Sequence, residues 1–159
     1  MSDRVYVNGK LFSFHSSILK IGDEPFSGWT SMSYSQKRTR GKGWGQSRSG
    51  RPRGRTSGKM ETDPLKIKFF SDSAQAVRDY LQGLAPDQIS YGEVVVPISL
   101  QLFEPSLGEI FRLFKDAVLM TEPGSVEEGT DPTYEELEFD IMWIETNGGT
   151  LYDSTQLRF

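Results

Sequence analysis

Few residues in this chain of 159 have types and spacings that suit catalysis. It has one histidine, His15, followed by Ser16 and Ser17, and it has no cysteine. A general base needs a partner that positions it, and a single imidazole excludes any site built on two histidines. Without cysteine there is no thiolate chemistry and no disulfide framework. We therefore interpret His15 as a histidine at a strand end, and the sequence predicts a protein that is not an enzyme.

A second candidate is a group of acids near the C-terminal end, where carboxylates could bind a metal ion. On a strand, Glu136, Glu138 and Asp140 would share one face, with Glu135 opposite. The segment has no DxDxDG calcium loop and no histidine partner. A solvated or interface face is therefore favoured over a metal site, and no cofactor is expected.

The third candidate runs from Lys37 to Lys59, KRTRGKGWGQSRSGRPRGRTSGK, and we call it the arm. It has no Asp or Glu, and its glycines lack the GxxxxGK[ST] and GxGxxG spacings of phosphate-binding loops. Its only large apolar residue is Trp44, so it cannot bury enough surface to offset the entropy of its own ordering. We expect a mobile, extended arm in the free subunit. Its cations are Lys37, Arg38, Arg40, Lys42, Arg48, Arg51, Arg53, Arg55 and Lys59.

Three interpretations of the arm stay open from composition alone. It could be a disordered solubilising loop, a nucleic-acid-binding Arg/Gly segment with an aromatic for stacking, or an arm that orders against an acidic partner. The third is favoured by the stretch from Glu122 to Asp140, which carries eight acids and no base. An arm that reaches an acidic face on the next copy makes a heterologous contact, which generates rings or filaments. The acids are Glu122, Glu127, Glu128, Asp131, Glu135, Glu136, Glu138 and Asp140.

Length and bulk composition predict a single domain over 1–159 that carries this arm. The chain has 36% hydrophobic residues and a net charge of −4, values typical of a foldable polar chain. No apolar run approaches the length of a membrane span, and the N-terminus MSDRVYVNGK has no apolar core of a signal peptide. We therefore expect a protein made and used in a cytoplasm, or in an assembly built there.

The elements that must position these residues are mostly strands, because apolar and polar residues alternate along much of the chain. Asn8-Gly9 predicts a hairpin over 5–14, and Pro97 predicts an edge position or a bulge for its strand. A turn or helical start is expected over 107–112. The other predicted strands span 16–22, 29–36, 65–69, 88–103, 113–121 and 137–145, with turns at Pro25–Gly28 and Asn147–Gly149, after which Leu151-Tyr152 starts a return strand.

One helix is predicted over 72–84, with Ser71 or Asp72 as its cap. The fold class is therefore mainly β: an antiparallel β-sandwich or barrel with one flanking α-helix and a long basic loop between strands. The apolar stripe of the helix is Ala76, Val77, Tyr80, Leu81 and Leu84.

The order of these features resembles the tail tube proteins of contractile-tailed bacteriophages. The likeness covers nearly the whole chain: the Asn-Gly hairpin, Ile21-Gly22 before an aromatic strand, the long Arg/Gly loop, and the strand Leu65–Phe69. Its C-terminal part has a polar loop with Gly129 and Asp131, an acidic approach to Phe139, and an Asn-Gly turn. Type VI secretion tube proteins and tube-initiating baseplate proteins share the fold of that family.

The resemblance implies a structural virion protein without catalysis, which self-assembles into stacked hexameric rings. The rings form a tube whose inner strands join into a lumen wall and which conducts phage DNA during ejection. The resemblance further implies tail sheath and baseplate partners, assembly in the bacterial host cytoplasm, and no membrane anchor. The family's long loop reaches the adjacent ring, and here that role falls on the arm, including Trp44.

A tube that conducts DNA should not grip phosphate, because such contacts bind tightly and without sequence preference. We therefore expect the arm to be buried in contacts between rings rather than to line the bore. The acids Glu127, Glu128, Asp131, Glu135, Glu136, Glu138 and Asp140 are expected either to contact the arm or to face the lumen. The alternative function is a nucleic-acid-binding β-barrel whose arm grips a nucleic-acid backbone.

Overall fold

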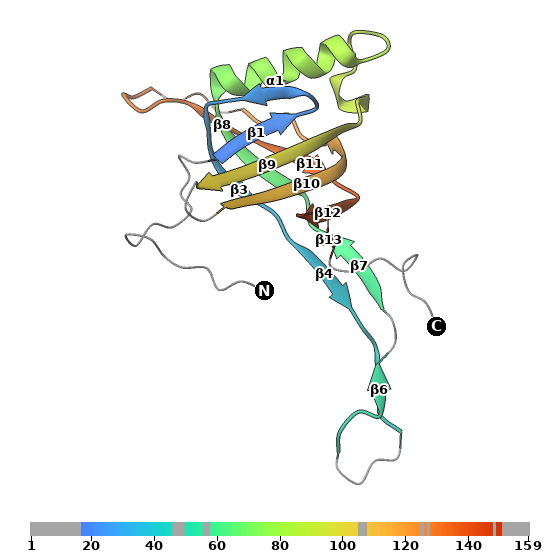
Figure 1. Cartoon of the computed structure of the whole chain (residues 1–159). Coiled ribbons are helices and arrows are strands. Elements are labelled where there is room, and N and C mark those ends of the chain that lie inside the picture. Colours follow the sequence, from blue (N-terminus) through green and yellow to red (C-terminus); the bar gives the residue numbers. More distant parts are fainter. Residues whose placement is uncertain are drawn as a thin grey trace.

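The structure is a computed structural model, and its main body is a β-sheet covered at one end by a helix (Figure 1). His15, the expected hairpin over 5–14 and the return at Leu151-Tyr152 lie outside the described residues, as do Arg48 and Glu127. The structure describes residues 17–45, 50–55, 58–104, 108–124, 126, 128–147 and 149–150.

Within the described residues the main sheet has 9 strands, joined in the order β2-β1-β9-β10-β11-β8-β3, and β12 and β13 extend from β10. Every pairing is antiparallel. The strands are β1 (Ser17–Ile21), β2 (Glu24–Phe26), β3 (Trp29–Ser33), β8 (Leu65–Phe70), β9 (Val96–Glu104), β10 (Gly108–Leu119), β11 (Tyr134–Asp140), β12 (Trp143–Thr146) and β13 (Gly149–Thr150).

The long strand β10 belongs to two layers. Most of β10 pairs with β9 and β12, whereas its last residues, Val118 and Leu119, pair with β11. Phe114 of one layer and Phe69 and Phe139 of the other are fully buried in one core, as aromatic side chains with the largest apolar surface should be. The prediction of a mainly β, antiparallel sandwich with one flanking helix is confirmed, and the described strands do not close into a barrel.

Strand β8 shows how the alternating pattern determines the packing. Leu65, Ile67 and Phe69 are fully buried, while Lys66 and Lys68 lie on the other face. A strand with one covered face needs this two-residue period, and the prediction for this strand is confirmed.

The predicted helix is confirmed as α1 (Ser71–Leu84), but its cap and its buried face differ from the prediction. The N-cap is Phe70, and it makes no side-chain capping bond. The buried face holds Ala74, Val77, Arg78 and Leu81, whereas Ala76 and Leu84 are exposed. The stripe is rotated because Arg78 turns inward to an acid of β11. No helix in the described part of the chain is long and apolar enough to cross a membrane.

The N-terminal turns are placed partly as expected. Gly28 lies between β2 and β3 with φ +80°, but Pro25 pairs with Lys20 in the edge strand β2, a position that tolerates proline. The sharp turn lies instead at Gly22, which has φ +63° and donates a 2.7 Å backbone hydrogen bond to Pro97. The hydroxyl of Tyr80 lies 2.6 Å from the position that a Cβ at Gly22 would occupy.

Several expectations for the second half of the chain need correction. The strand predicted over 88–103 begins only at Val96, because Tyr91–Glu93 form the short 3-10 helix η2. The helical start over 107–112 is wrong, because β10 begins at Gly108 and pairs residue by residue with β9. Of the two settings predicted for Pro97, the edge strand is wrong, since β1 and β10 flank β9. The bulge is confirmed, because the pairing of β10 is irregular opposite Pro97, between Phe114 and Ala117. The strand over 137–145 breaks after Asp140 into β11 and β12, which pair with different sides of the sheet. The turn at Asn147 is confirmed, with φ +50°.

Candidate assembly interface

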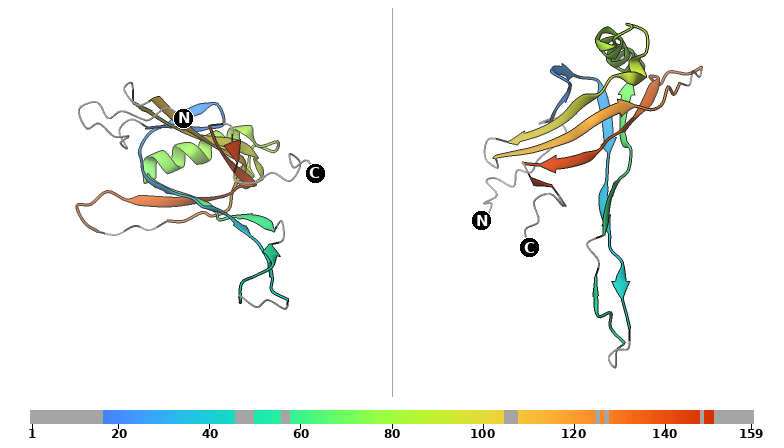
Figure 2. Two further views of the ribbon diagram at one scale, coloured as in Figure 1. Left: turned by 60° about the horizontal axis from the view of Figure 1, so that its bottom comes forward. Right: turned by 90° about the vertical axis from the view of Figure 1, so that its right-hand side faces the viewer.

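The arm is a β-hairpin that projects far from the body (Figures 1 and 2). Its strands β4 (Gln36–Thr39) and β7 (Lys59–Thr62) pair with each other, and so do β5 (Lys42–Gly43) and β6 (Gly54–Arg55). The arm is extended, and its described strands are paired along two short ladders. The arm continues the antiparallel strands β3 and β8 outward, but the pairing shifts by one residue: Ser33 is opposite Lys66 in the body, and Gln36 is opposite Thr62 in the arm.

The side chains of the arm are available for contact with another molecule. Trp44 is 54% exposed, and the described cations are exposed except for Arg38, which is half-buried. An ion pair joins Lys59 and Glu61 at 3.7 Å, but both side chains are solvated, so it contributes little to stability. The exposed cations are Lys37, Arg40, Lys42, Arg51, Arg53, Arg55 and Lys59.

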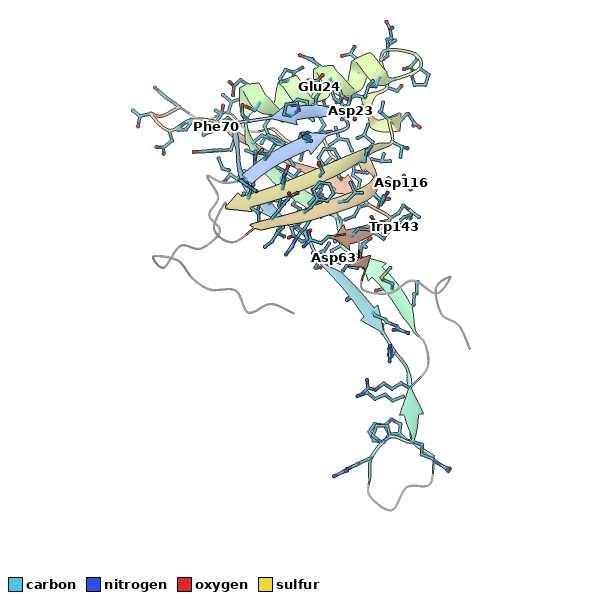
Figure 3. The ribbon with its side chains drawn as sticks, in the orientation of Figure 1. Asp23, Glu24, Asp63, Phe70, Asp116 and Trp143 are labelled. Carbon is cyan, nitrogen blue, oxygen red and sulfur yellow. The ribbon has the colours of Figure 1, made fainter. Side chains whose placement is uncertain are left out.

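The root of the arm is bonded to the body. Gln36 and Thr62 are directly opposite each other in the first rung of the β4–β7 ladder. The side-chain oxygen of Gln36 accepts a 2.6 Å hydrogen bond from the backbone N–H of Ile144, and the Thr62 hydroxyl donates a 2.8 Å bond to the carbonyl of Ile141. Between this rung and the body, at the root of the arm where Figure 3 labels Asp63, the Ser35 hydroxyl donates a hydrogen bond to the Asp63 carboxylate.

The acids of β11 are divided between its two faces. Glu136, Glu138 and Asp140 alternate with the buried Leu137 and Phe139, as predicted. Glu138 lies 3.5 Å from Lys66 on the neighbouring strand β8. Glu136 and Asp140 are exposed, so this face can meet another molecule.

Glu135 is engaged within its own chain, and its partner was not predicted from the sequence. Its carboxylate lies 2.9 Å from Nη2 of Arg78 on α1, and the two side chains are only 13% and 8% exposed. Arg78 also donates a 3.3 Å hydrogen bond to the carbonyl of Pro123. The hydrogen bond to Glu135 raises the pKa of Arg78, so the guanidinium stays charged. An arginine within an otherwise mixed helix face gives no local signal that it is buried.

An open hollow of about 500 Å³ lies where the loop after β10 returns to β11. Its lining includes Glu128, Asp131, Glu135 and Glu136, with Lys68 as the one basic side chain among its described lining residues. Beside it, the Tyr91 hydroxyl donates to Glu122, and this bond raises the pKa of Tyr91. The hollow is therefore acidic, with Glu135 already neutralised by Arg78.

The acidic hollow and the arm lie at opposite ends of the molecule. The loop between β10 and β11 is beside α1, whereas the arm extends from the other end of the β3–β8 pair (Figures 1 and 2). The pairing register agrees, since Tyr134 is opposite Phe70 at the end of β8 remote from the arm. The arm of one copy therefore does not reach the hollow of the same copy.

No three His, Cys, Asp or Glu side chains among the described residues are grouped so that they could hold a metal ion. Glu136, Glu138 and Asp140 share a face but do not converge, because they are spaced along an extended strand. The face is therefore interpreted as a surface for contact.

No protein-family model matches the sequence, and no curated protein matches it. Its fold is similar to that of Hcp1 from Flavobacterium johnsoniae, with 13% identity, a TM-score of 0.55, and coverage of 86% of this chain and 98% of that one. It is also similar to a chain of the sheath/tube terminator of the extracellular contractile injection system PVC in its extended state. The identity is 10% and the TM-score is 0.66, with coverage of 87% of this chain and 97% of that one. A type six secretion system protein has 10% identity and a TM-score of 0.53, with coverage of 82% of this chain and 81% of that one.

These likenesses extend over nearly the whole of each structure, at identities that show the fold alone. The expected likeness to tube proteins of contractile tails and of type VI secretion is therefore confirmed for the fold.

Proposed function

We propose that this chain is a structural subunit of the tube of a contractile tail or injection apparatus, built from stacked rings of identical copies. The observation that carries the proposal is that a basic arm and an acidic hollow lie at opposite ends of a chain with this fold. Different surfaces that complement each other make a heterologous contact, which either closes into a ring or repeats along an axis as an open stack. A ring that presents arms on one side and hollows on the other would stack in one direction.

At each junction the arm cations of one ring would contact the acids of the next, chiefly Glu128, Asp131 and Glu136. A single exposed ion pair is weak, but many pairs repeated around a ring and partly removed from water give strength and register. Glu138 and Asp140 lie along β11 toward the arm root, and would face either the same junction or the lumen. Burial of the arm in the junction also keeps its cations away from the bore.

The finer parts of the proposal follow from the likeness to phage tail tubes. The rings would be hexameric, the tube would conduct phage DNA, and sheath and baseplate proteins would be its partners. Assembly would take place in the bacterial host cytoplasm, and the product would be part of the virion tail. The proposal includes no catalytic step and no cofactor.

One observation favours a second function. Exposed arginines flank the exposed Trp44 on a projecting hairpin, as in segments that bind single-stranded nucleic acid through backbone charge and base stacking. A binder of this kind would be a monomer or a small oligomer that releases nucleic acid as salt rises.

Negative-stain electron microscopy of the full chain beside a copy that lacks residues 41–55 tests the proposal. We expect tubes or stacked rings from the full chain, and single rings or monomers from the deletion. Small particles from both proteins, with nucleic acid retained only by the full chain, would replace the tube with the nucleic-acid binder. A third copy, in which residues 41–55 are replaced by a Gly/Ser linker of equal length, separates the loss of arm chemistry from the shortening of the chain.

A further inference from the structure

We propose that Gln36 and Thr62 are positioning residues that fix the direction of the arm before two rings meet. This inference rests on the proposed function, since it concerns how the arm is presented to the next ring. Neither residue belongs to the basic set of the arm, and neither is exposed enough to contact a second copy widely. Their role is assigned by what they bond inside their own chain.

The two side chains project from the same face of the hairpin toward the place where β11 ends and β12 begins. Gln36 accepts from the N–H of Ile144 at 2.6 Å, and Thr62 donates to the carbonyl of Ile141 at 2.8 Å. Ile141 and Ile144 are 3% and 8% exposed, so this corner of the body is well packed. Each strand of the arm thus contributes one bond to the same rigid corner.

These bonds matter because the chain between the body and the arm is otherwise narrow. Only Tyr34-Ser35 on one strand and residues 63–65 on the other separate the β3–β8 ladder from the β4–β7 ladder. One backbone hydrogen bond spans this segment: the N–H of Asp63 donates to the carbonyl of Ser35 at 3.0 Å. An isolated two-stranded ribbon is weakly stable and twists freely, so attachment to a packed body restricts its direction.

Gln36 also connects the two strands of the arm. Its amide nitrogen donates a hydrogen bond to the sulfur of Met60 at 3.0 Å, while its amide oxygen accepts one from the backbone N–H of Ile144. Gln36, Met60 and Thr62 lie on this bonded face of the arm together with the half-buried Arg38, and the exposed residues of β4 and β7 lie on the opposite face. An arm held in this way meets its partner with much of its orientational freedom already removed, which strengthens binding without any new contact.

The decisive variant removes both bonds to the body, together with the bond from Gln36 to Met60 within the arm, and leaves every arm cation in place. Thr62→Val keeps the shape of the side chain without its hydroxyl, and Gln36→Met keeps its length without the amide. Thr62→Ser restores the hydroxyl and is the conservative rescue. Thr39→Val is the matched control, because Thr39 lies on the same ladder with its side chain exposed on the opposite face.

The direction of the arm is measured in unassembled protein. The natural chain has no cysteine, so spin labels at Gly43→Cys in the arm and Gln75→Cys on α1 report one distance by pulsed electron resonance. We expect the distance distribution of the Gln36→Met/Thr62→Val variant to be clearly broader than those of the parent and the Thr39→Val control, because mobility of the tip is common to all three proteins. A distribution that is unchanged in the double variant would overturn the inference.

Assembly is then compared by electron microscopy at equal concentration. We expect the double variant to form rings in normal yield but tubes several-fold shorter, with the length partly restored by Thr62→Ser in place of Thr62→Val. Tubes of normal length from a protein with a broadened distribution would overturn the link to assembly. If the parent formed no tubes, the proposed function would fail, while the distance measurement would still decide whether these residues direct the arm. A melting temperature equal to that of the control excludes general unfolding.

Discussion

Nη2 of Arg78 on α1 lies 2.9 Å from Oε1 of Glu135 on β11, and both side chains are almost completely buried. The same guanidinium reaches the carbonyl of Pro123, so one arginine joins the helix, the strand and the loop that surrounds the acidic hollow. This contact fixes the shape of the end of the molecule that we propose as the acceptor for the arm. It also removes Glu135 from the acids available to a partner.

Replacement of Arg78 by Met should destabilise the fold by about 3 kcal/mol, because it leaves the Glu135 carboxylate buried without its cation. Glu135→Gln in the same chain should recover part of the loss, since the remaining amide is uncharged. Chemical denaturation monitored by circular dichroism measures both changes. The matched control is Lys66→Met, which breaks the more exposed pair with Glu138 and should cost less than about 1 kcal/mol. Equal losses at the two sites would contradict this account.

The turn after α1 should respond to acid in a defined range. Asp87 accepts hydrogen bonds from the backbone N–H groups of Ile89 and Ser90, and these bonds lower its pKa from 3.8 to about 2. A group whose pKa is lower in the folded state stabilises the fold fully above its unfolded pKa, and loses that effect as the pH falls through the folded pKa. The contribution of Asp87 should therefore be complete above pH 3.8 and disappear toward pH 2.

Titration of the Asp87 carboxyl carbon by NMR measures this directly, and a midpoint near 3.8 would contradict the assignment. In the Asp87→Asn variant, the loss of folding stability between pH 3.8 and about 2 that is due to this carboxyl should be absent.

Two glycines should respond to alanine with opposite signs. Gly22→Ala should destabilise the fold by about 1–3 kcal/mol, because Gly22 has φ +63° and a Cβ there would meet the hydroxyl of Tyr80. Gly83→Ala, within α1 and with open space around the new methyl group, should stabilise it by up to about 1 kcal/mol. Thermal melts compare the two variants with the parent. Melting temperatures that shift in the same direction would contradict the description of the surroundings of Gly22 or of Gly83.

Reversal of charge in the hollow should impair stacking but not ring formation. In Glu128→Lys/Glu136→Lys, the hollow would repel the arm of the next copy, so we expect rings without long tubes. Arg51→Glu/Arg53→Glu in the same chain should restore part of the tube length. Asp72→Lys/Asp79→Lys on α1 is the control for a general effect of added charge. Loss of rings themselves in the hollow variant would place these acids in contacts within a ring instead.

The sequence was sufficient where a local pattern determines the structure. Strand β8 and helix α1 were predicted because alternation and helical periodicity survive in any packing. Arg78 was missed because its burial depends on an acid that lies 57 residues away in the chain. Gln36 and Thr62 were missed for the same reason, since polar side chains reveal no partner until the fold brings Ile141 and Ile144 beside them.

The arm shows both the strength and the limit of composition. Its charge and glycine content indicated an extended, exposed segment, but composition could not show that its two strands pair with each other where they leave β3 and β8. The hairpin exists because its strands leave the body already paired. Mobility in the free subunit remains a prediction for the part of the arm beyond the β4–β7 ladder, whose root is held by Gln36 and Thr62. Slow amide exchange across 40–56 in the monomer would contradict it.

The most direct test of the central claim is cross-linking between two copies, each with one introduced cysteine in a chain that otherwise has none. Arg53→Cys in the arm and Glu128→Cys in the hollow, on chains of different mass, are mixed, assembled and joined with a short bifunctional reagent. If the arm of one ring enters the hollow of the next, the product is a mixed dimer that forms only in assembled tubes and is absent from the unassembled mixture of the two chains. Efficient assembly without the mixed dimer, or a product made only of two Arg53→Cys chains, would contradict the claim.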